Sequence, residues 1–193
     1  MKEYGDEAFI RMLQENQEEA KNKDIRQGSV FVEDQELVFR EHEILKEQLW
    51  MWMPDTFAPL SRELMRIKYP NENRPDHIWS NPQTTINVSF SHRQEKMEPG
   101  EAGEVRGYMG QVIGHLYPSS SILDQDLVKA DQHEHEIAWM DFVTPAMDTQ
   151  IYNLMFFTSL KGRLLMGSCN CLAHEQEEWK GLFIQMILSI RTA

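Results

Sequence analysis

Residues 136–191 read EIAWMDFVTPAMDTQIYNLMFFTSLKGRLLMGSCNCLAHEQEEWKGLFIQMILSIR, and this stretch decides the fold. Acidic residues 175, 177 and 178 precede an apolar segment, and Arg191 follows it, as the dipole of a helix favours. The apolar residues of that segment recur at spacings of three and four, the pattern of a helix with one buried face: Trp179, Leu182, Phe183, Met186, Ile187 and Ile190. The sequence therefore predicts a long, well-buried helix at this position.

Three apolar runs come before this helix and predict antiparallel strands. Residues 151–157 and 163–171 are joined by a short link that contains Gly162, which can adopt the positive φ of a tight hairpin. Residues 136–143 form the third run, and Pro145 ends it because proline cannot donate a backbone hydrogen bond. A helix packed on an antiparallel sheet buries both apolar faces, which predicts an α+β fold.

The upstream half of the chain predicts shorter elements. Residues 84–90 alternate between apolar and polar, as a half-buried strand does, and residues 30–32, 37–39, 49–53 and 126–131 are shorter candidates. Residues 59–67 predict a short helix with Leu64 and Ile67 facing inward. Residues 104–117 predict a helix whose three glycines pack closely on the sheet; its apolar face comprises Val105, Tyr108, Met109, Val112 and Leu116.

This order of elements resembles the PsbP-like fold family over residues 37–191. The resemblance rests on the early Trp-rich strand at 50–54, the following strands and helices, Ile151-Tyr152-Asn153 and the helix of Trp179. It implies a central antiparallel sheet flanked by helices in an α/β/α sandwich. The family includes a photosystem subunit, a Ran-binding transport factor and bacterial proteins of unknown function. A bacterial member of this kind is expected to be a binding or adaptor protein, and no residue matches a known functional site of the family.

Composition limits the class of protein. The 193 residues are 41% hydrophobic and carry a formal net charge of −12, which suits one domain with a real core and disfavours nucleic acid as a partner. We expect a helical N-terminal extension at 1–28 and a single domain at 29–193. The chain has no run of 18 apolar residues and no apolar leader, so we expect a cytoplasmic protein without membrane insertion.

Two pairs of residues raise the question of metal or redox chemistry. His133 and His135 would share one face of a strand and could bind Zn²⁺ or Ni²⁺ with a third ligand, or could lie in a solvated turn. Cys169 and Cys171 are either a redox pair or two buried free thiols, and a disulfide across an extended i, i+2 pair has poor geometry. We predict no cofactor and no metal, and keep a metal-dependent or small-ligand enzyme using His133 and His135 as the alternative function.

The best candidate for a partner surface is the proline-rich loop at 69–82. Tyr69, Arg74, His77 and Trp79 lie in it, and tyrosine, tryptophan and arginine dominate binding hot spots. The alternative is that Tyr69 and Trp79 fold back to cap the sheet. Trp52 lies either in a buried strand or on an exposed patch. These residues predict a non-catalytic adaptor or chaperone-like domain with a protein partner, while a self-associating homo-oligomer is a further alternative.

Overall fold

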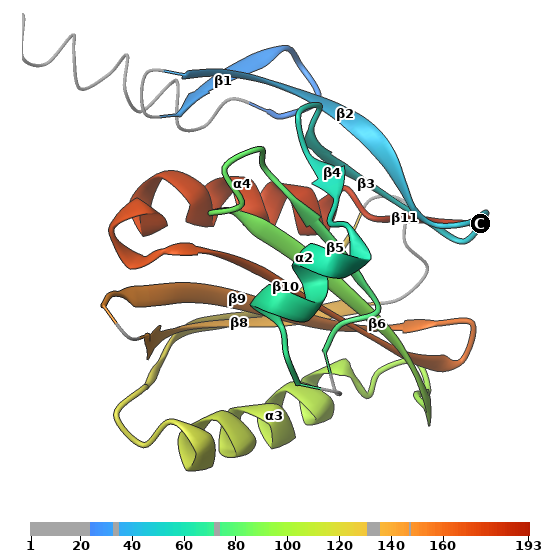
Figure 1. The fold of residues 1–193 in the computed structure, drawn as a ribbon. Helices are drawn as coiled ribbons and strands as arrows, with labels where there is room; N and C mark the ends of the chain where they lie inside the picture. The colour runs from blue at the N-terminus through green and yellow to red at the C-terminus, as the bar shows by residue number, and fades with distance from the viewer. Residues whose placement is uncertain (1–23, 33–34, 72–73, 131–135, 147) are drawn as a thin grey trace, which may run out of the picture.

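The computed structural model describes residues 24–32, 35–71, 74–130, 136–146 and 148–193 of the chain. Its strands form two antiparallel sheets (Figure 1). The smaller sheet has four strands in the order β1-β2-β3-β11. Their bounds are β1 Ser29–Val32, β2 Gln35–Leu45, β3 Leu49–Pro54 and β11 Arg191–Thr192.

The larger sheet has seven strands in the order β4-β5-β6-β10-β9-β8-β7. The hairpin between β9 and β10 turns at Lys161 and Gly162, which both have positive φ, so the predicted tight turn is confirmed. The bounds are β4 Ala58–Pro59, β5 His77–Ser80, β6 Asn87–Lys96, β7 Ile122–Lys129, β8 Glu136–Pro145, β9 Gln150–Leu160 and β10 Arg163–Leu172.

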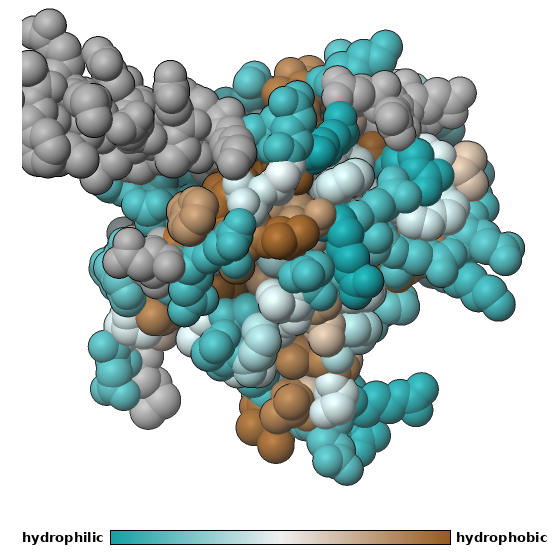
Figure 2. All heavy atoms as spheres, turned by 90° about the horizontal axis from the view of Figure 1, so that it is seen from above, coloured by the Kyte–Doolittle hydropathy of each residue, from teal (hydrophilic) through white to brown (hydrophobic). Residues whose placement is uncertain are grey.

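The helices fix the order of the layers. Helix α3 (Ala102–Leu116) covers one face of the seven-stranded sheet, and α4 (Gln176–Leu188) lies between its other face and the four-stranded sheet (Figure 1). The α+β fold with helices on both faces of a central antiparallel sheet is therefore confirmed. The separate small sheet over α4 was not predicted. Seen from above that sheet, the surface is mostly hydrophilic, with small separate hydrophobic areas (Figure 2).

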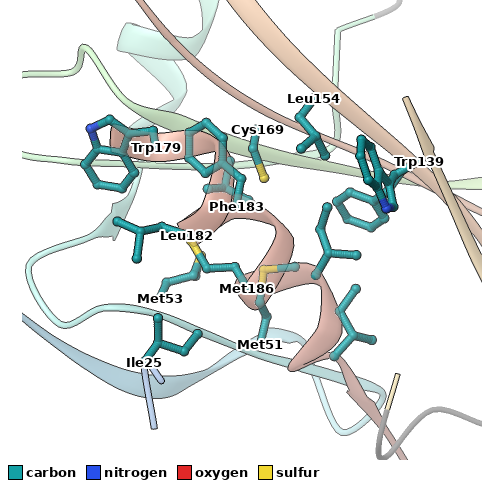
Figure 3. Close-up of a cluster of buried hydrophobic side chains, with 14 of the residues drawn as sticks. Ile25, Met51, Met53, Trp139, Leu154, Cys169, Trp179, Leu182, Phe183 and Met186 are labelled. Carbon is teal, nitrogen blue, oxygen red and sulfur yellow. The ribbon is translucent and has the colours of Figure 1, made fainter. Parts of the chain in front are cut away.

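The main core surrounds α4. All six apolar residues predicted for the helix segment are buried. Met51 and Met53 of β3 approach α4 from one side, and Leu154 and Cys169 of the large sheet from the other (Figure 3). Because α4 is covered on both sides, it buries more of its circumference than a helix on a single sheet. Ile25, which the sequence placed in the N-terminal extension, is also buried in this core.

The predicted buried face is wrong for one helix and right in part for another. Helix α2 (Arg62–Lys68) exposes 43% of Leu64 and 75% of Ile67, and it has no buried residue. Helix α3 packs Val105 and Met109 against the core as predicted, but it exposes Tyr108 and Leu116 and buries Ile113 instead. In both helices the apolar stripe is wider than the surface that covers it, so periodicity identified the helix but not the covered side.

The predicted close packing of the α3 glycines is also wrong. A Cβ atom added at Gly107 or Gly114 would meet nothing within 4 Å, and one at Gly110 would lie an ordinary 3.8 Å from Met140 Sδ. The close approach lies instead in β10, where a Cβ on Gly167 would fall 2.1 Å from Cζ of Phe156. Residues 1–23 of the predicted extension lie outside the described residues. No helix of the described part is long and apolar enough to cross a bilayer.

Candidate functional site

The candidate site is a groove where the β2–β3 hairpin, helix α2 and strand β5 meet, called here the α2–β5 groove. It consists of two adjoining hollows that share Arg62, Met65 and Asp76. The apolar hollow, of about 580 Å³, is lined by Glu43, Ile44, Lys46, Pro59, Leu60, Arg62, Met65, Asp76, His77, Ile78 and Trp79. The arginine hollow, of about 410 Å³, is lined by Arg62, Met65, Arg66, Arg74, Pro75 and Asp76.

Hydrogen bonds at both ends hold α2 against the large sheet. The hydroxyl of Ser61 accepts from the backbone N–H of Leu64 at 3.3 Å, which caps the helix N-terminus. The backbone N–H of Leu60 donates to the carbonyl of Ile78 in β5 at 2.8 Å. After the helix, the ammonium of Lys68 donates to the carbonyl oxygen of Thr84. These bonds fix the wall of the groove that carries Arg62, Met65 and Arg66.

Trp79 lines the apolar hollow and contacts both sheets. It lies opposite Val88 in the large sheet, and its half-buried ring packs against the main core. Its ring also meets His42 of β2 edge to face, with 5.0 Å between centroids. Burial, followed by the charge of Arg40, lowers the pKa of His42, while a ring nitrogen lies 3.2 Å from the Pro54 carbonyl. The rigid placement of Trp79 by two sheets suits a binding anchor.

The second hollow is strongly basic. Arg62 and Arg66 are one helical turn apart on α2, and Arg74 lies on the facing loop. Nη1 of Arg74 lies 3.5 Å from the carbonyl of Asn71, and Asp76 is the single carboxylate among the described residues of the lining. Among the residues that the structure describes, none of the three guanidinium groups forms an ion pair. Anions are the ligands that such a hollow attracts.

Three of the five predicted partner-binding residues line this groove. They are Arg74, His77 and Trp79. Tyr69 ends α2 and points to the sheet, where burial raises its pKa and its hydroxyl hydrogen-bonds with the side chain of Asn170. The alternative that Tyr69 caps the sheet therefore holds, whereas Trp79 packs on the core and also lines the groove. Trp52 is half-buried in β3 and does not line the groove.

Sequence reasoning missed Ile44, Arg62, Met65 and Arg66 as parts of this site. The i, i+4 spacing of the two arginines within a predicted helix was a usable signal for a shared face. Ile44 carried no such signal, because its place beside α2 depends on how the small sheet packs on the large one.

The metal and thiol candidates have different outcomes. His133 and His135 lie outside the described residues, so a metal bound by them stays a prediction. Within the described ranges, no group of three or more His, Cys, Asp or Glu side chains could hold a metal ion. Cys169 and Cys171 are both buried and are not joined in a disulfide, as the second of the two interpretations expected. Burial, followed by the proximity of Cys171, raises the pKa of Cys169, which keeps it a protonated and weak nucleophile.

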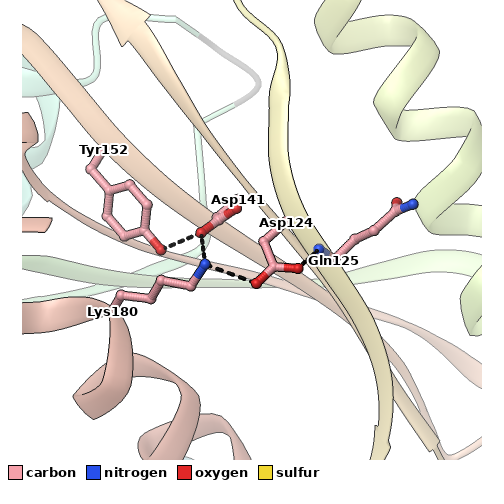
Figure 4. A network of polar contacts seen from close by, with 5 residues as sticks. All are labelled: Asp124, Gln125, Asp141, Tyr152 and Lys180. Atoms are coloured by element: carbon pink, nitrogen blue, oxygen red, sulfur yellow. Dashed lines mark hydrogen bonds and ion pairs between the residues drawn. The ribbon is translucent and has the colours of Figure 1, made fainter. Parts of the chain in front are cut away.

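A separate polar network joins α4 to the far edge of the large sheet (Figure 4). The carboxylate of Asp141 is fully buried and accepts from the Tyr152 hydroxyl at 2.7 Å. Nζ of Lys180 lies 2.9 Å from Asp141 Oδ2 and 3.0 Å from Asp124 Oδ2. Burial opposes the charge on Lys180, but its bonds to the two carboxylates raise its pKa overall. These contacts are internal to the fold and link β7, β8, β9 and α4.

Comparison with known proteins supports the fold. No protein family model and no curated protein matches the chain. The solution structure of cyanobacterial PsbP (CyanoP) from Synechocystis sp. PCC 6803 is similar, with a TM-score of 0.59 and 11% identity over 80% of this chain and 92% of that one. A Pseudomonas aeruginosa protein of unknown function matches with a TM-score of 0.44 and 11% identity, over 78% of this chain and 94% of that one. The chain therefore has a PsbP-like fold, as its order of elements predicted.

Proposed function

We propose that this chain is a non-catalytic, cytoplasmic protein-binding domain of adaptor or chaperone type. It holds a segment of a protein partner in the α2–β5 groove. The observation that carries this proposal is the apolar hollow, which places Ile44, Met65 and Trp79 around one concave surface. Binding energy concentrates where apolar and aromatic side chains form a pocket inside a polar rim. Glu43, Lys46, Asp76 and His77 supply that rim.

The two hollows define the chemistry of the partner segment. Volumes of about 580 and 410 Å³ lie within the usual range for binding pockets, so each can take side chains of substantial size. An apolar side chain of the partner segment fits beside Trp79, and an anionic side chain fits among the arginines. The shared residues Arg62, Met65 and Asp76 place both positions within reach of a single segment.

Peptide-display selection against the full chain tests this proposal. Met65→Glu places a charge in both hollows, whereas Ile67→Glu makes the same change on the same helix at a 75% exposed position that does not line either hollow. We expect the selection to enrich peptides that contain an apolar and an acidic residue. These peptides should bind the wild type and Ile67→Glu equally tightly. The Met65→Glu change should lower the affinity of these peptides by about tenfold or more, as the loss of a hot-spot residue does.

The proposal is contradicted if the selected peptides bind the Met65→Glu variant as tightly as they bind the wild type. Failure to enrich any peptide whose binding depends on Met65 would contradict it equally. Circular dichroism of both variants provides the folding control, since α2 has no buried residue and both changes should leave the fold intact.

A further inference from the structure

We propose that the arginine hollow recognises a phosphate group on the partner segment, so that the protein prefers a phosphorylated partner. This inference rests on the proposed function and names the chemistry of its second hollow. Arg62, Arg66 and Arg74 line the hollow together with Met65, Pro75 and Asp76. Clusters of arginine are the usual means by which proteins bind phosphorylated side chains.

Charge complementarity favours a dianion over a carboxylate. Among the described residues of the lining, three guanidinium groups and the carboxylate of Asp76 leave two positive charges, on a chain whose formal net charge is −12. One arginine can satisfy both oxygens of a carboxylate through a bidentate contact. A phosphorylated side chain carries up to two negative charges and three terminal oxygens, and can therefore engage all three arginines.

The arrangement of the three side chains supports a common target. Arg62 and Arg66 project from one face of α2, because residues four apart are neighbours on a helix. Arg74 reaches the hollow from the other wall, and Pro75 restricts the backbone that follows it. Met65 lines the hollow beside the arginines.

Two arginines elsewhere in the protein, Arg163 and Arg191, show a contrasting arrangement. The guanidinium of Arg191 makes two hydrogen bonds to Glu41, at 2.8 and 3.0 Å, and stacks on Trp50. Arg163 donates to the backbone carbonyls of His92 and Arg93. The three arginines of the hollow form no ion pair with any described side chain, even though they repel one another. A bound anion would supply the missing opposite charge.

The first test titrates the full chain with inorganic phosphate at constant ionic strength and follows the arginine Nε–H signals by NMR. We expect saturable shifts at Arg62, Arg66 and Arg74, with acetate binding about tenfold more weakly because it offers one negative charge. Arg66→Gln and Arg74→Gln should each weaken phosphate binding several-fold. Asp76→Asn should strengthen it, since it removes a negative charge from the lining. Lys129→Gln, on the opposite edge of the large sheet, should change nothing.

The second test compares a peptide from the display selection in three forms, with serine, glutamate or phosphoserine at its acidic position. The phosphoserine form should bind about tenfold more tightly than the glutamate form. Inorganic phosphate should compete with both of these forms and not with the serine form, because only the acidic side chains occupy the arginine hollow. Peptides that bind through Met65 with no gain from phosphoserine would overturn this inference and leave the proposed function intact. Phosphate binding without any peptide binding would overturn both, because the phosphate would then belong to some other ligand.

Discussion

At the scale of single residues, the buried carboxylate of Asp141 makes the strongest demand on its neighbours. It is 0% exposed, and Lys180 provides the positive charge that compensates for its burial. We predict that Lys180→Met lowers the free energy of unfolding by about 3 kcal/mol, because it leaves a buried charge unpaired. Asp124→Asn should cost less than about 1 kcal/mol, since Asp124 is 55% exposed and solvent screens its contact. Urea denaturation measures both, and equal losses would contradict this assignment.

The same region predicts how stability depends on pH. Burial raises the pKa of Tyr152 above its ordinary range, and the hydrogen bond to Asp141 raises it further. Burial also raises the pKa of Cys169. A group whose pKa is raised by folding stabilises the protein below its unfolded pKa, and that stabilisation is lost as the pH rises.

The free energy of unfolding should therefore decline above a pH of about 8.5, where an unfolded cysteine ionises, and more steeply above about 10, where an unfolded tyrosine ionises. Denaturation curves at a series of pH values test this. Tyr152→Phe should make the alkaline decline shallower, because phenylalanine has no proton to lose. Parallel declines for the wild type and Tyr152→Phe would show that Tyr152 is not the source.

Gly167 is required by packing within the core. Any side chain at this position would collide with the ring of Phe156, which fills the space beside β10. We predict that Gly167→Ala lowers the free energy of unfolding by about 2–3 kcal/mol, as overpacking of a core does. Thermal or urea denaturation measures the change. An unchanged stability would mean that Phe156 moves aside at no cost.

At the scale of elements, the sequence predicted best where burial is greatest. The strands β8, β9 and β10 and helix α4 were found because their apolar runs are long and almost fully covered. The covered faces of α2 and, in part, of α3 were misjudged because residues such as Ile67 and Tyr108 are apolar yet exposed. Periodicity reports which residues share a face, whereas the packing of distant elements decides which face is covered.

In helix α3, changing glycine to alanine should raise the free energy of unfolding, whereas the Gly167→Ala change should lower it. Gly107 and Gly114 lie in helical positions with open space around them. Gly107→Ala and Gly114→Ala should each raise the free energy of unfolding by about 0.5–1 kcal/mol, because alanine favours the helix and restricts the unfolded chain. Denaturation of both variants tests this. A loss of stability in either would indicate that the glycine makes a close contact after all.

At the scale of the whole molecule, the α2–β5 groove arises from the meeting of the two sheets. Its lining comes from three segments, which lie at 43–46, 59–66 and 74–79. The sequence identified the last segment from its arginine, histidine and tryptophan. It could not identify the others, because no local pattern reports that the β2–β3 hairpin and α2 come to lie beside β5.

Part of the groove is basic, although the chain as a whole is acidic. We therefore expect the affinity for an anionic partner to fall as the salt concentration increases.

The most direct test of the central claim is to map the binding surface by backbone amide NMR, with a selected peptide added to the full ¹⁵N-labelled chain. We predict that the largest shifts fall on residues 43–46, 60–66 and 74–79, three segments that only the fold brings together. Shifts concentrated on α3 and β7, with the groove unaffected, would contradict the claim that the α2–β5 groove is the binding site.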